Sequence, residues 1–324
     1  MTARGDAAWM DAAAALAARG RPLSRPNPAV GALLVRDGRV LARGWTQPTG
    51  RPHAEAMALA ALDGTSPAGA TLYVTLEPCA HASTRGPSCT SLVVAARPAR
   101  VVIGVTDPDP RTAGQGVAAL RAAGIAVDVL DSPAARASLE GYLMRAAQGR
   151  PHVTLKLAMS LDGRIALPSG ESQWITGAQA RAHTHAMRAR ADAILVGGGT
   201  LRADAPRLDV RLPGLEGRSP ERWVLTRGTA PDGWRPVADI TAPQAFGNAQ
   251  YLFVEGGAQA AATFLAADLV DRLLLYRAPI VIGSGLPGVG DIGLGSLAQA
   301  HGRWRAMHRQ TLGSDLLDVY ERTR

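Results

Sequence analysis

The chain has 324 residues, enough for two domains of ordinary size, and its hydrophobic content of 47% supports full cores and excludes a disordered chain. The net charge is +8, but the basic residues are scattered and aromatic residues make up only 4% of the chain. A protein that binds single strands of nucleic acid usually interleaves stacking aromatic side chains with its charges, so this composition favours phosphorylated small molecules over RNA. No stretch approaches the roughly 18 apolar residues that span a bilayer, and the N-terminal segment lacks the apolar core of a signal peptide. We therefore expect a cytoplasmic protein.

The first part of the chain predicts alternating helices and strands. Residues 6–19 predict a helix, and Asp37-Gly38 predicts the turn of a hairpin between strands 30–35 and 40–44. The elements expected after the hairpin are a helix over 53–62, a strand over 71–76, a helix over 90–96, a strand over 101–105, a helix over 116–123 and a strand over 125–130. This order is typical of an α/β domain with buried strands.

The stretch from His53 to Cys89 carries the strongest chemical signal. It opens with His53-Ala54-Glu55 and closes with Pro78-Cys79 and Cys89, and these two cysteines are the only ones in the chain. One imidazole and two thiolates suit Zn²⁺ with its fourth position open, as in a catalytic site. Glu55 can stand beside the metal without being a ligand and carry protons there. His-x-Glu followed by Pro-Cys is the signature of the zinc deaminases of nucleobases.

Two other uses of these residues stay open. A disulfide between Cys79 and Cys89 would need an oxidising compartment, of which the sequence gives no sign. The metal could instead be structural, in a non-enzymatic binding module, if a fourth protein ligand closed the site. His81 could supply that ligand.

The two cysteines are further apart than the Cys-x-x-Cys of most zinc deaminases. This longer spacing resembles the deaminase half of the bifunctional riboflavin-biosynthesis deaminase/reductase family, although the loop 80–88 departs from the commonest family sequence and keeps only its first histidine, as His81. The resemblance extends to the motifs 27–31, 75–79 and 107–110. It implies a cytidine-deaminase-like α/β/α domain over residues 1–148, with His53, Cys79 and Cys89 as zinc ligands and Glu55 as the proton carrier.

After the linker 148–151, the chain opens a second α/β domain with a strand over 152–160. The motifs 155–164, 169–176, 196–204, 208–211 and 254–257 resemble the reductase half of the same family, in the same order. The resemblance implies a dihydrofolate-reductase-like α/β domain over residues 149–324 that binds NADPH. It implies cofactor contacts at Ala158, Trp174, Thr200, Asp204 and Gly257, and substrate contacts at Ser172, Arg188, Leu208, Arg211 and Glu255.

Three side-chain types in these motifs have a chemical rationale. Arg188 and Arg211 suit a ribose phosphate, because arginine forms bidentate pairs with phosphate oxygens. Lys156 is the single lysine of an arginine-rich chain, and its compact ammonium cannot be mimicked by a guanidinium, so we expect it to orient the sugar or its phosphate. Asn27 lies where a loop enters the first strand and could present its amide to the edge of a base; a turn-forming asparagine is the alternative.

The resemblance implies that zinc-dependent deamination of a diaminopyrimidinone carrying a ribosylamino 5-phosphate is followed by NADPH-dependent reduction of its ribose to a ribityl chain. We expect a small phosphorylated pyrimidine as the substrate, a homo-oligomer, and neither a nucleic acid nor a membrane as partner. The rival hypothesis is a zinc-dependent nucleic-acid base deaminase with an RNA-binding C-terminal extension. That hypothesis predicts Cys-x-x-Cys and an aromatic groove, and the sequence has neither.

Overall fold

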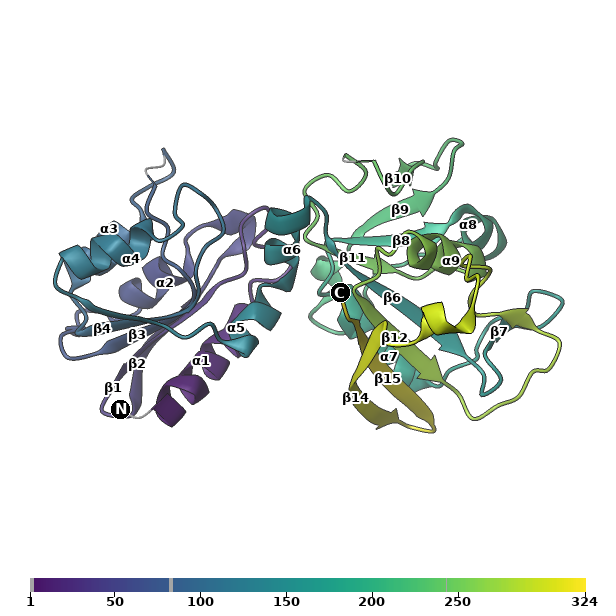
Figure 1. Cartoon of the computed structure of the whole chain (residues 1–324), viewed down its shortest axis with the longest axis horizontal. Helices are drawn as coiled ribbons and strands as arrows, with labels where there is room; N and C mark the ends of the chain where they lie inside the picture. Colours follow the sequence, from purple (N-terminus) through teal and green to yellow (C-terminus); the bar gives the residue numbers. More distant parts are fainter. Residues whose placement is uncertain (1–2, 82–83, 243) are drawn as a thin grey trace. The chain divides into compact units, whose positions relative to one another are not determined.

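The computed structural model describes residues 3–81, 84–242 and 244–324, and the chain divides into two compact units, residues 1–149 and 150–324. Figure 1 follows the chain through both units, each of which is described here by itself. Ala82 and Ser83, in the loop 80–88 between the two cysteines, lie outside the described residues. Among the helices that are described, none is long and apolar enough to cross a membrane.

The first unit is built on a five-stranded sheet. Its strands lie in the order β2 (Arg39–Trp45), β1 (Gly31–Arg36), β3 (Thr71–Leu76), β4 (Arg100–Val105) and β5 (Ala126–Val129). β1 pairs antiparallel with β2 and with β3, whereas β3, β4 and β5 run parallel. The hairpin turn that the sequence predicted is present, and Asp37 and Gly38 both have the positive φ of such a turn.

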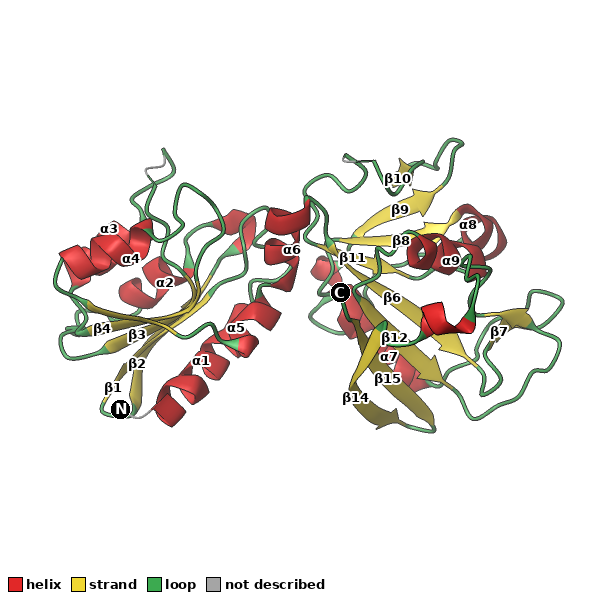
Figure 2. Ribbon diagram, viewed as in Figure 1, coloured by secondary structure: helices red, strands yellow, loops and turns green. Residues whose placement is uncertain are grey.

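Helices cover both faces of this sheet (Figure 2). α1 (Ala3–Ala17) and α5 (Pro133–Ser138) pack on one face, and α2 (Ala54–Ala60), α3 (Cys89–Ala96) and α4 (Gln115–Ala122) lie on the other. A 3₁₀ turn (Pro48–Gly50) precedes α2, and α6 (Glu140–Gln148) ends the unit. Gln148, which the sequence placed in the linker, is the last residue of α6, because the left-handed Gly149 ends that helix.

The second unit is built on an eight-stranded sheet. Its strands lie in the order β10 (Trp234–Val237), β9 (Glu221–Leu225), β8 (Ala193–Gly197), β11 (Tyr251–Val254), β6 (His152–Met159), β12 (Arg272–Arg277), β15 (Asp315–Arg322) and β14 (Trp304–Leu312). Neighbours from β10 to β12 run parallel, and β15 and β14 complete the sheet with antiparallel pairs. β7 (Arg164–Ala166) and β13 (Leu286–Pro287) form a separate two-stranded sheet.

Two apolar cores flank the large sheet. One contains Leu155 and Leu157 of β6 together with Phe264 of α9 (Ala258–Ala266); the other contains Tyr276 of β12 and Ala180 of α7 (Ala178–Arg188). Because alternate residues of a strand point to opposite faces, Lys156 points away from the core of Leu155 and Leu157. The remaining helical segments are α8 (Gly198–Asp204) and the 3₁₀ turns Glu216–Arg218 and Leu297–Ala300.

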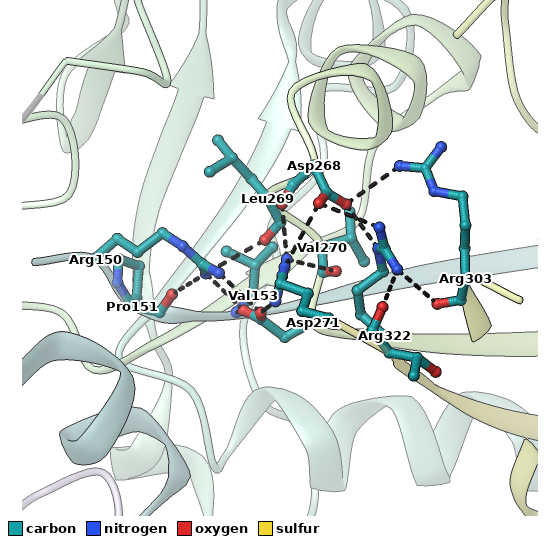
Figure 3. A network of polar contacts seen from close by, with 11 residues as sticks. Arg150, Pro151, Val153, Asp268, Leu269, Val270, Asp271, Arg303 and Arg322 are labelled. Carbon is teal, nitrogen blue, oxygen red and sulfur yellow. Dashed lines mark hydrogen bonds and ion pairs between the residues drawn. The ribbon is translucent and has the colours of Figure 1, made fainter. Parts of the chain in front are cut away.

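An ion-pair network gathers around the turn between α9 and β12 (Figure 3). The buried Asp271 binds both terminal nitrogens of Arg150 at 2.7 and 2.9 Å and also accepts the backbone N–H of Val153 at 2.8 Å. Arg322 binds Asp268 in the same turn, and Arg324 is paired with Asp271. The first and last residues of the second unit are thus held by one turn.

Candidate active sites

The three predicted zinc ligands come together in the first unit. His53 is the residue before α2, Cys79 follows β3, and Cys89 is the first residue of α3. The Nδ1 atom of His53 lies 3.6 Å from the sulfur of Cys79 and 3.3 Å from the sulfur of Cys89. Zinc with bonds of about 2.0 Å to nitrogen and 2.3 Å to sulfur, in a tetrahedron, separates such atoms by about 3.6 Å. The donor set and its spacing therefore fit zinc.

Backbone hydrogen bonds fix the two cysteines relative to each other. The N–H of Cys89, at the start of α3, donates to the sulfur of Cys79 at 3.3 Å. Thr90 donates its N–H to the carbonyl of Cys79 at 3.1 Å and its hydroxyl to the carbonyl of Pro78 at 2.9 Å. The first turn of α3 thus holds the Pro78-Cys79 turn and fixes the two sulfurs relative to each other.

Asn27 lies against the imidazole of His53. Its Nδ2 atom is 3.0 Å from Nε2 of His53 and donates to the carbonyl of Gly50 at 3.2 Å. Gly50 has a positive φ, and a Cβ there would come within 2.5 Å of the Asn27 side chain, so glycine makes room for this contact. The amide nitrogen thus lies between the Gly50 carbonyl and the His53 ring, whereas the sequence had left open both a substrate contact and a turn-forming role for Asn27.

Burial and hydrogen bonds shift the pKa values of the ionisable side chains at this site. A hydrogen bond from the Cys89 thiol, assisted by one from His53, lowers the pKa of Cys79 to about 4. The same bond and burial raise the pKa of Cys89. Glu55, in the first turn of α2, is only 3% exposed, and burial raises the pKa of its carboxyl group. A carboxyl group with a raised pKa is suited to take up and release a proton near neutral pH.

His81 is not part of the metal cluster. Among the described residues, the groups that could hold a metal are His53, Cys79 and Cys89 alone. The Nδ1 atom of His81 lies instead 3.4 Å from the hydroxyl of Thr112. This three-residue set agrees with an open catalytic site and not with the closed structural site that a fourth ligand would make.

A second cluster of charged side chains lies in the second unit. Arg188, at the end of α7, binds Glu255 with two parallel hydrogen bonds of 2.6 and 2.9 Å. The ammonium of Lys156 in β6 lies 3.7 Å from the same carboxylate, which directly follows the neighbouring strand β11. The fork of Arg188, which the sequence assigned to a phosphate, is thus directed at Glu255 in this structure.

The loop after α8 completes this cluster. Leu208 is buried, and the carbonyl of Asp209 accepts hydrogen bonds from Arg188 at 3.0 Å and from His185 at 3.1 Å. The other ring nitrogen of His185 lies 3.3 Å from the guanidinium of Arg211. Sequence reasoning missed His185, although its place one helical turn before Arg188 puts both side chains on the same face of α7.

Charge compensation distinguishes Glu255 from an ordinary buried acid. Burial by itself would raise the pKa of this carboxyl group, but Lys156 and Arg188 outweigh that effect and lower the pKa. Glu255 is therefore an anion at neutral pH. In turn, burial lowers the pKa of His185, with Arg188 and Arg211 acting in the same direction, so its imidazole is neutral.

The residues that the resemblance assigned to NADPH are less tightly grouped. The hydroxyl of Thr200 in α8 accepts the N–H of Gly257, the residue before α9, at 3.2 Å. Ala158 lies in β6 beside Tyr276 of β12. Trp174 is 64% exposed, with the guanidinium of Arg181 4.8 Å from its ring centre. Asp204 ends α8 and is exposed, and Ser172 lies in the loop after β7.

Comparisons with known proteins match both units. The zinc-binding region of cytidine and deoxycytidylate deaminases matches residues 3–105, and the RibD C-terminal domain matches residues 151–243 and 244–317. The riboflavin biosynthesis protein RibD of Aquifex aeolicus is 34% identical over 98% of both chains.

Two solved structures are similar over 99% of this chain and 99% of their own. RibD of Acinetobacter baumannii has a TM-score of 0.86 at 32% identity. A diaminohydroxyphosphoribosylaminopyrimidine deaminase/5-amino-6-(5-phosphoribosylamino)uracil reductase from Thermotoga maritima has a TM-score of 0.87 at 30% identity. The chain therefore belongs to the RibD family of riboflavin-biosynthesis enzymes, in which a zinc-dependent deaminase domain and an NADPH-dependent reductase domain are joined in one polypeptide.

Proposed function

We propose that residues 1–148 deaminate a diaminopyrimidinone that carries a ribosylamino 5-phosphate, and that residues 149–324 then reduce its ribose to a ribityl chain. The observation that carries this proposal is the His53, Cys79 and Cys89 cluster, which lies beside the buried Glu55 in a chain that resembles RibD throughout. Deamination replaces a ring-carbon–nitrogen bond by a carbonyl, so that water is consumed and ammonia leaves. Reduction adds a hydride to the first carbon of the sugar, while the bond from that carbon to the ring oxygen breaks and the oxygen takes up a proton, so that the ribose ring opens to the ribityl chain.

In the deaminase site, His53, Cys79 and Cys89 would hold the zinc, which supplies Lewis-acid activation of water when it is bound. Glu55 takes the proton that the water loses and gives it to the departing amine nitrogen, a role that agrees with its raised pKa. Asn27 lies beside the imidazole of His53, with its amide nitrogen 3.0 Å from Nε2, and offers its amide oxygen to the substrate ring. That oxygen has no hydrogen-bond partner within the described part of the chain.

In the reductase site, NADPH supplies the hydride when it is bound. Lys156 orients the sugar through its ammonium group, and Glu255, whose carboxylate lies 3.7 Å away, holds that ammonium in place. Arg211 binds the phosphate, and Arg188, whose fork is held by Glu255, lies in the same site and contributes its positive charge, while Ser172 and Leu208 complete the substrate site. Ala158, Trp174, Thr200, Asp204 and Gly257 hold the cofactor, and the N-terminus of α9 after Gly257 favours its phosphate groups.

We further propose that the enzyme works in the cytoplasm as a homo-oligomer, without a nucleic-acid partner. The scattered basic residues with few aromatics argue against RNA binding. Light scattering on the purified protein tests the first point. The absence of a shift of single-stranded RNA in a mobility assay at low salt tests the second.

The decisive experiment for the function follows ammonia release and NADPH consumption in one reaction with the diaminopyrimidinone substrate. Ammonia is expected first, in an amount equal to the substrate, and NADPH oxidation second. NADPH oxidation without ammonia would contradict the proposed order. A preparation that neither releases ammonia from the diaminopyrimidinone nor oxidises NADPH would contradict the function as a whole.

A further inference from the structure

The turn that delivers Cys79 also contains Glu77, for which the proposed reaction has no use. Glu77 directly follows β3 and lies two positions before the metal ligand. It is only 2% exposed, and no basic side chain is paired with it in the part of the chain that the structure describes. Burying a carboxylate costs free energy unless hydrogen-bond donors or cations compensate its charge. The groups that donate to Glu77 therefore indicate which part of the chain it stabilises.

Those partners are three backbone amides of one segment, residues 107–117. One carboxylate oxygen accepts the N–H of Gly114 at 3.1 Å and that of Asp107 at 3.2 Å, and the other accepts the N–H of Val117 at 3.1 Å. Gly114 and Val117 belong to the start of α4, where unpaired amides and the helix dipole favour a negative charge. Glu77 thus caps a helix that is distant from it in the sequence.

A second observation places the same segment against the cysteine turn. A Cβ on Gly116, in the first turn of α4, would lie 2.5 Å from the carbonyl oxygen of Pro78, closer than real Cβ atoms come. Only glycine therefore permits this approach. The fully buried Thr112 of the same segment contacts His81, two residues beyond Cys79.

We propose that Glu77 is a positioning residue of the deaminase site: it holds segment 107–117 against the Pro78-Cys79 turn and thereby orients Cys79 toward the metal. The carboxylate acts through the backbone and touches neither metal nor substrate. The activity part of the test rests on the proposed function of the first unit, whereas its spectroscopic part does not.

The test is Glu77→Gln in the full-length protein, with Co²⁺ in place of zinc. Glutamine keeps the size of the side chain but turns an NH₂ group toward amides that need an acceptor. The expected results are shifted cobalt–thiolate absorption bands, faster hydrogen exchange at Gly114 and Val117, and a deaminase kcat/KM about tenfold lower. Reduction of the deaminated intermediate should stay unchanged.

The matched control is Asp192→Asn, which alters a buried carboxylate that accepts the N–H groups of Gln250 and Tyr251 in the second unit. It should lower the melting temperature and leave the cobalt spectrum and deamination as in the wild type. If Glu77→Gln only lowers the melting temperature and keeps the wild-type spectrum and kcat/KM, Glu77 is no more than a helix cap and the proposal is wrong.

Two further outcomes also test the proposed role of Glu77. If Glu77→Gln does not fold, Gly116→Ala separates the same two segments from the helix side, and its cobalt spectrum must shift for the proposal to stand. If the wild type releases no ammonia, the proposed function fails, and the spectra and exchange rates still test Glu77.

Discussion

Two buried glutamates lie at the two candidate sites, and their surroundings shift their pKa values in opposite directions. Burial raises the pKa of Glu55, which stands beside the metal ligands. Glu255 also has little exposed surface, with 9% of its side chain exposed, but Lys156 and Arg188 lower its pKa. The comparison shows that burial alone does not define the role of an acid. Glu55 is equipped to exchange a proton, whereas Glu255 is a fixed anion that keeps two cations in place.

The two sites also differ in how the chain builds them. The proposed metal ligands come from a short stretch, His53 to Cys89, and hydrogen bonds from the start of α3 fix the Pro78-Cys79 turn. The charged cluster joins Lys156 to Glu255, which are distant in sequence and meet because β6 and β11 are neighbours. If this contrast is right, a change at one site should impair that site's activity and leave the activity of the other site unchanged.

The largest expected effect is at the metal. Cys79→Ala leaves two ligands, which cannot hold a tetrahedral zinc site, so zinc and deamination should both be lost. Elemental analysis and ammonia release measure the two effects. His81→Ala is the matched control and should keep one zinc per chain, because His81 contacts Thr112 instead. Undiminished zinc in Cys79→Ala would refute the ligand assignment.

The next effect tests the proton-carrying glutamate. Glu55→Gln keeps the shape of the side chain but cannot accept a proton, so deamination should fall by about 10²- to 10⁴-fold while zinc is retained. Reduction of already deaminated substrate should proceed at the wild-type rate. A loss of that reduction would show that the two sites are coupled, and full deaminase activity would remove Glu55 from the mechanism.

A smaller effect is expected at the single lysine. Lys156→Arg keeps the charge but replaces a compact ammonium by a planar fork. Loss of one charge-assisted hydrogen bond costs about 1.5–3 kcal/mol, so NADPH-dependent turnover should fall about 10- to 100-fold. Deamination should not change. Arg43→Lys, an exchange at an exposed position, is the control; equal kinetics in both variants would make Lys156 an ordinary surface charge.

The smallest effect concerns stability and its dependence on pH. Glu255→Gln leaves Lys156 and Arg188 without their anion and should lower the free energy of unfolding by about 1–3 kcal/mol at pH 7. Because the folded-state pKa of Glu255 is lowered, its stabilisation is present above the unfolded value, about 4.3, and is lost as the pH falls through the folded value.

Denaturant titrations of Glu255→Gln and the wild type at pH 7 and pH 3 measure this difference. The gap between the two proteins should narrow at the lower pH. Glu171→Gln, at an exposed position, serves as the control and should show no gap at either pH. A gap that is independent of pH would mean that Glu255 does not act as an anion.

The sequence predicted which three side chains lie together at the candidate metal site, because their chemistry is rare and local. Histidine and cysteine are rare in this chain. The three residues His53, Cys79 and Cys89 lie close together in the sequence, and they meet at the ends of elements whose bounds follow from the apolar pattern. The hairpin at Asp37-Gly38 was predicted for a similar reason, since a tight turn has a local signature.

The charged cluster of the second unit could not be predicted from the sequence in the same way. The pairing of Lys156 with Glu255 depends on the order of strands in the sheet, which no local pattern determines. Among 35 basic residues, nothing in the sequence shows that the fork of Arg188 points at a carboxylate. α5 was missed because it is short, although Ser132 and Pro133 are a recognisable helix start.

The ion pairs around Asp271 decide where the chain should be divided if the reductase half is to be produced alone. A recombinant fragment that begins at Arg150 keeps the guanidinium that Asp271 binds at 2.7 and 2.9 Å. A fragment that begins at His152, the first residue of β6, would omit only two residues yet remove a principal partner of a buried carboxylate. At about 1–3 kcal/mol for a lost partner and about 2–4 °C per kcal/mol, the shorter fragment should melt several degrees lower. The second unit therefore begins at Arg150, because the side chain of this residue is needed although it precedes the first strand.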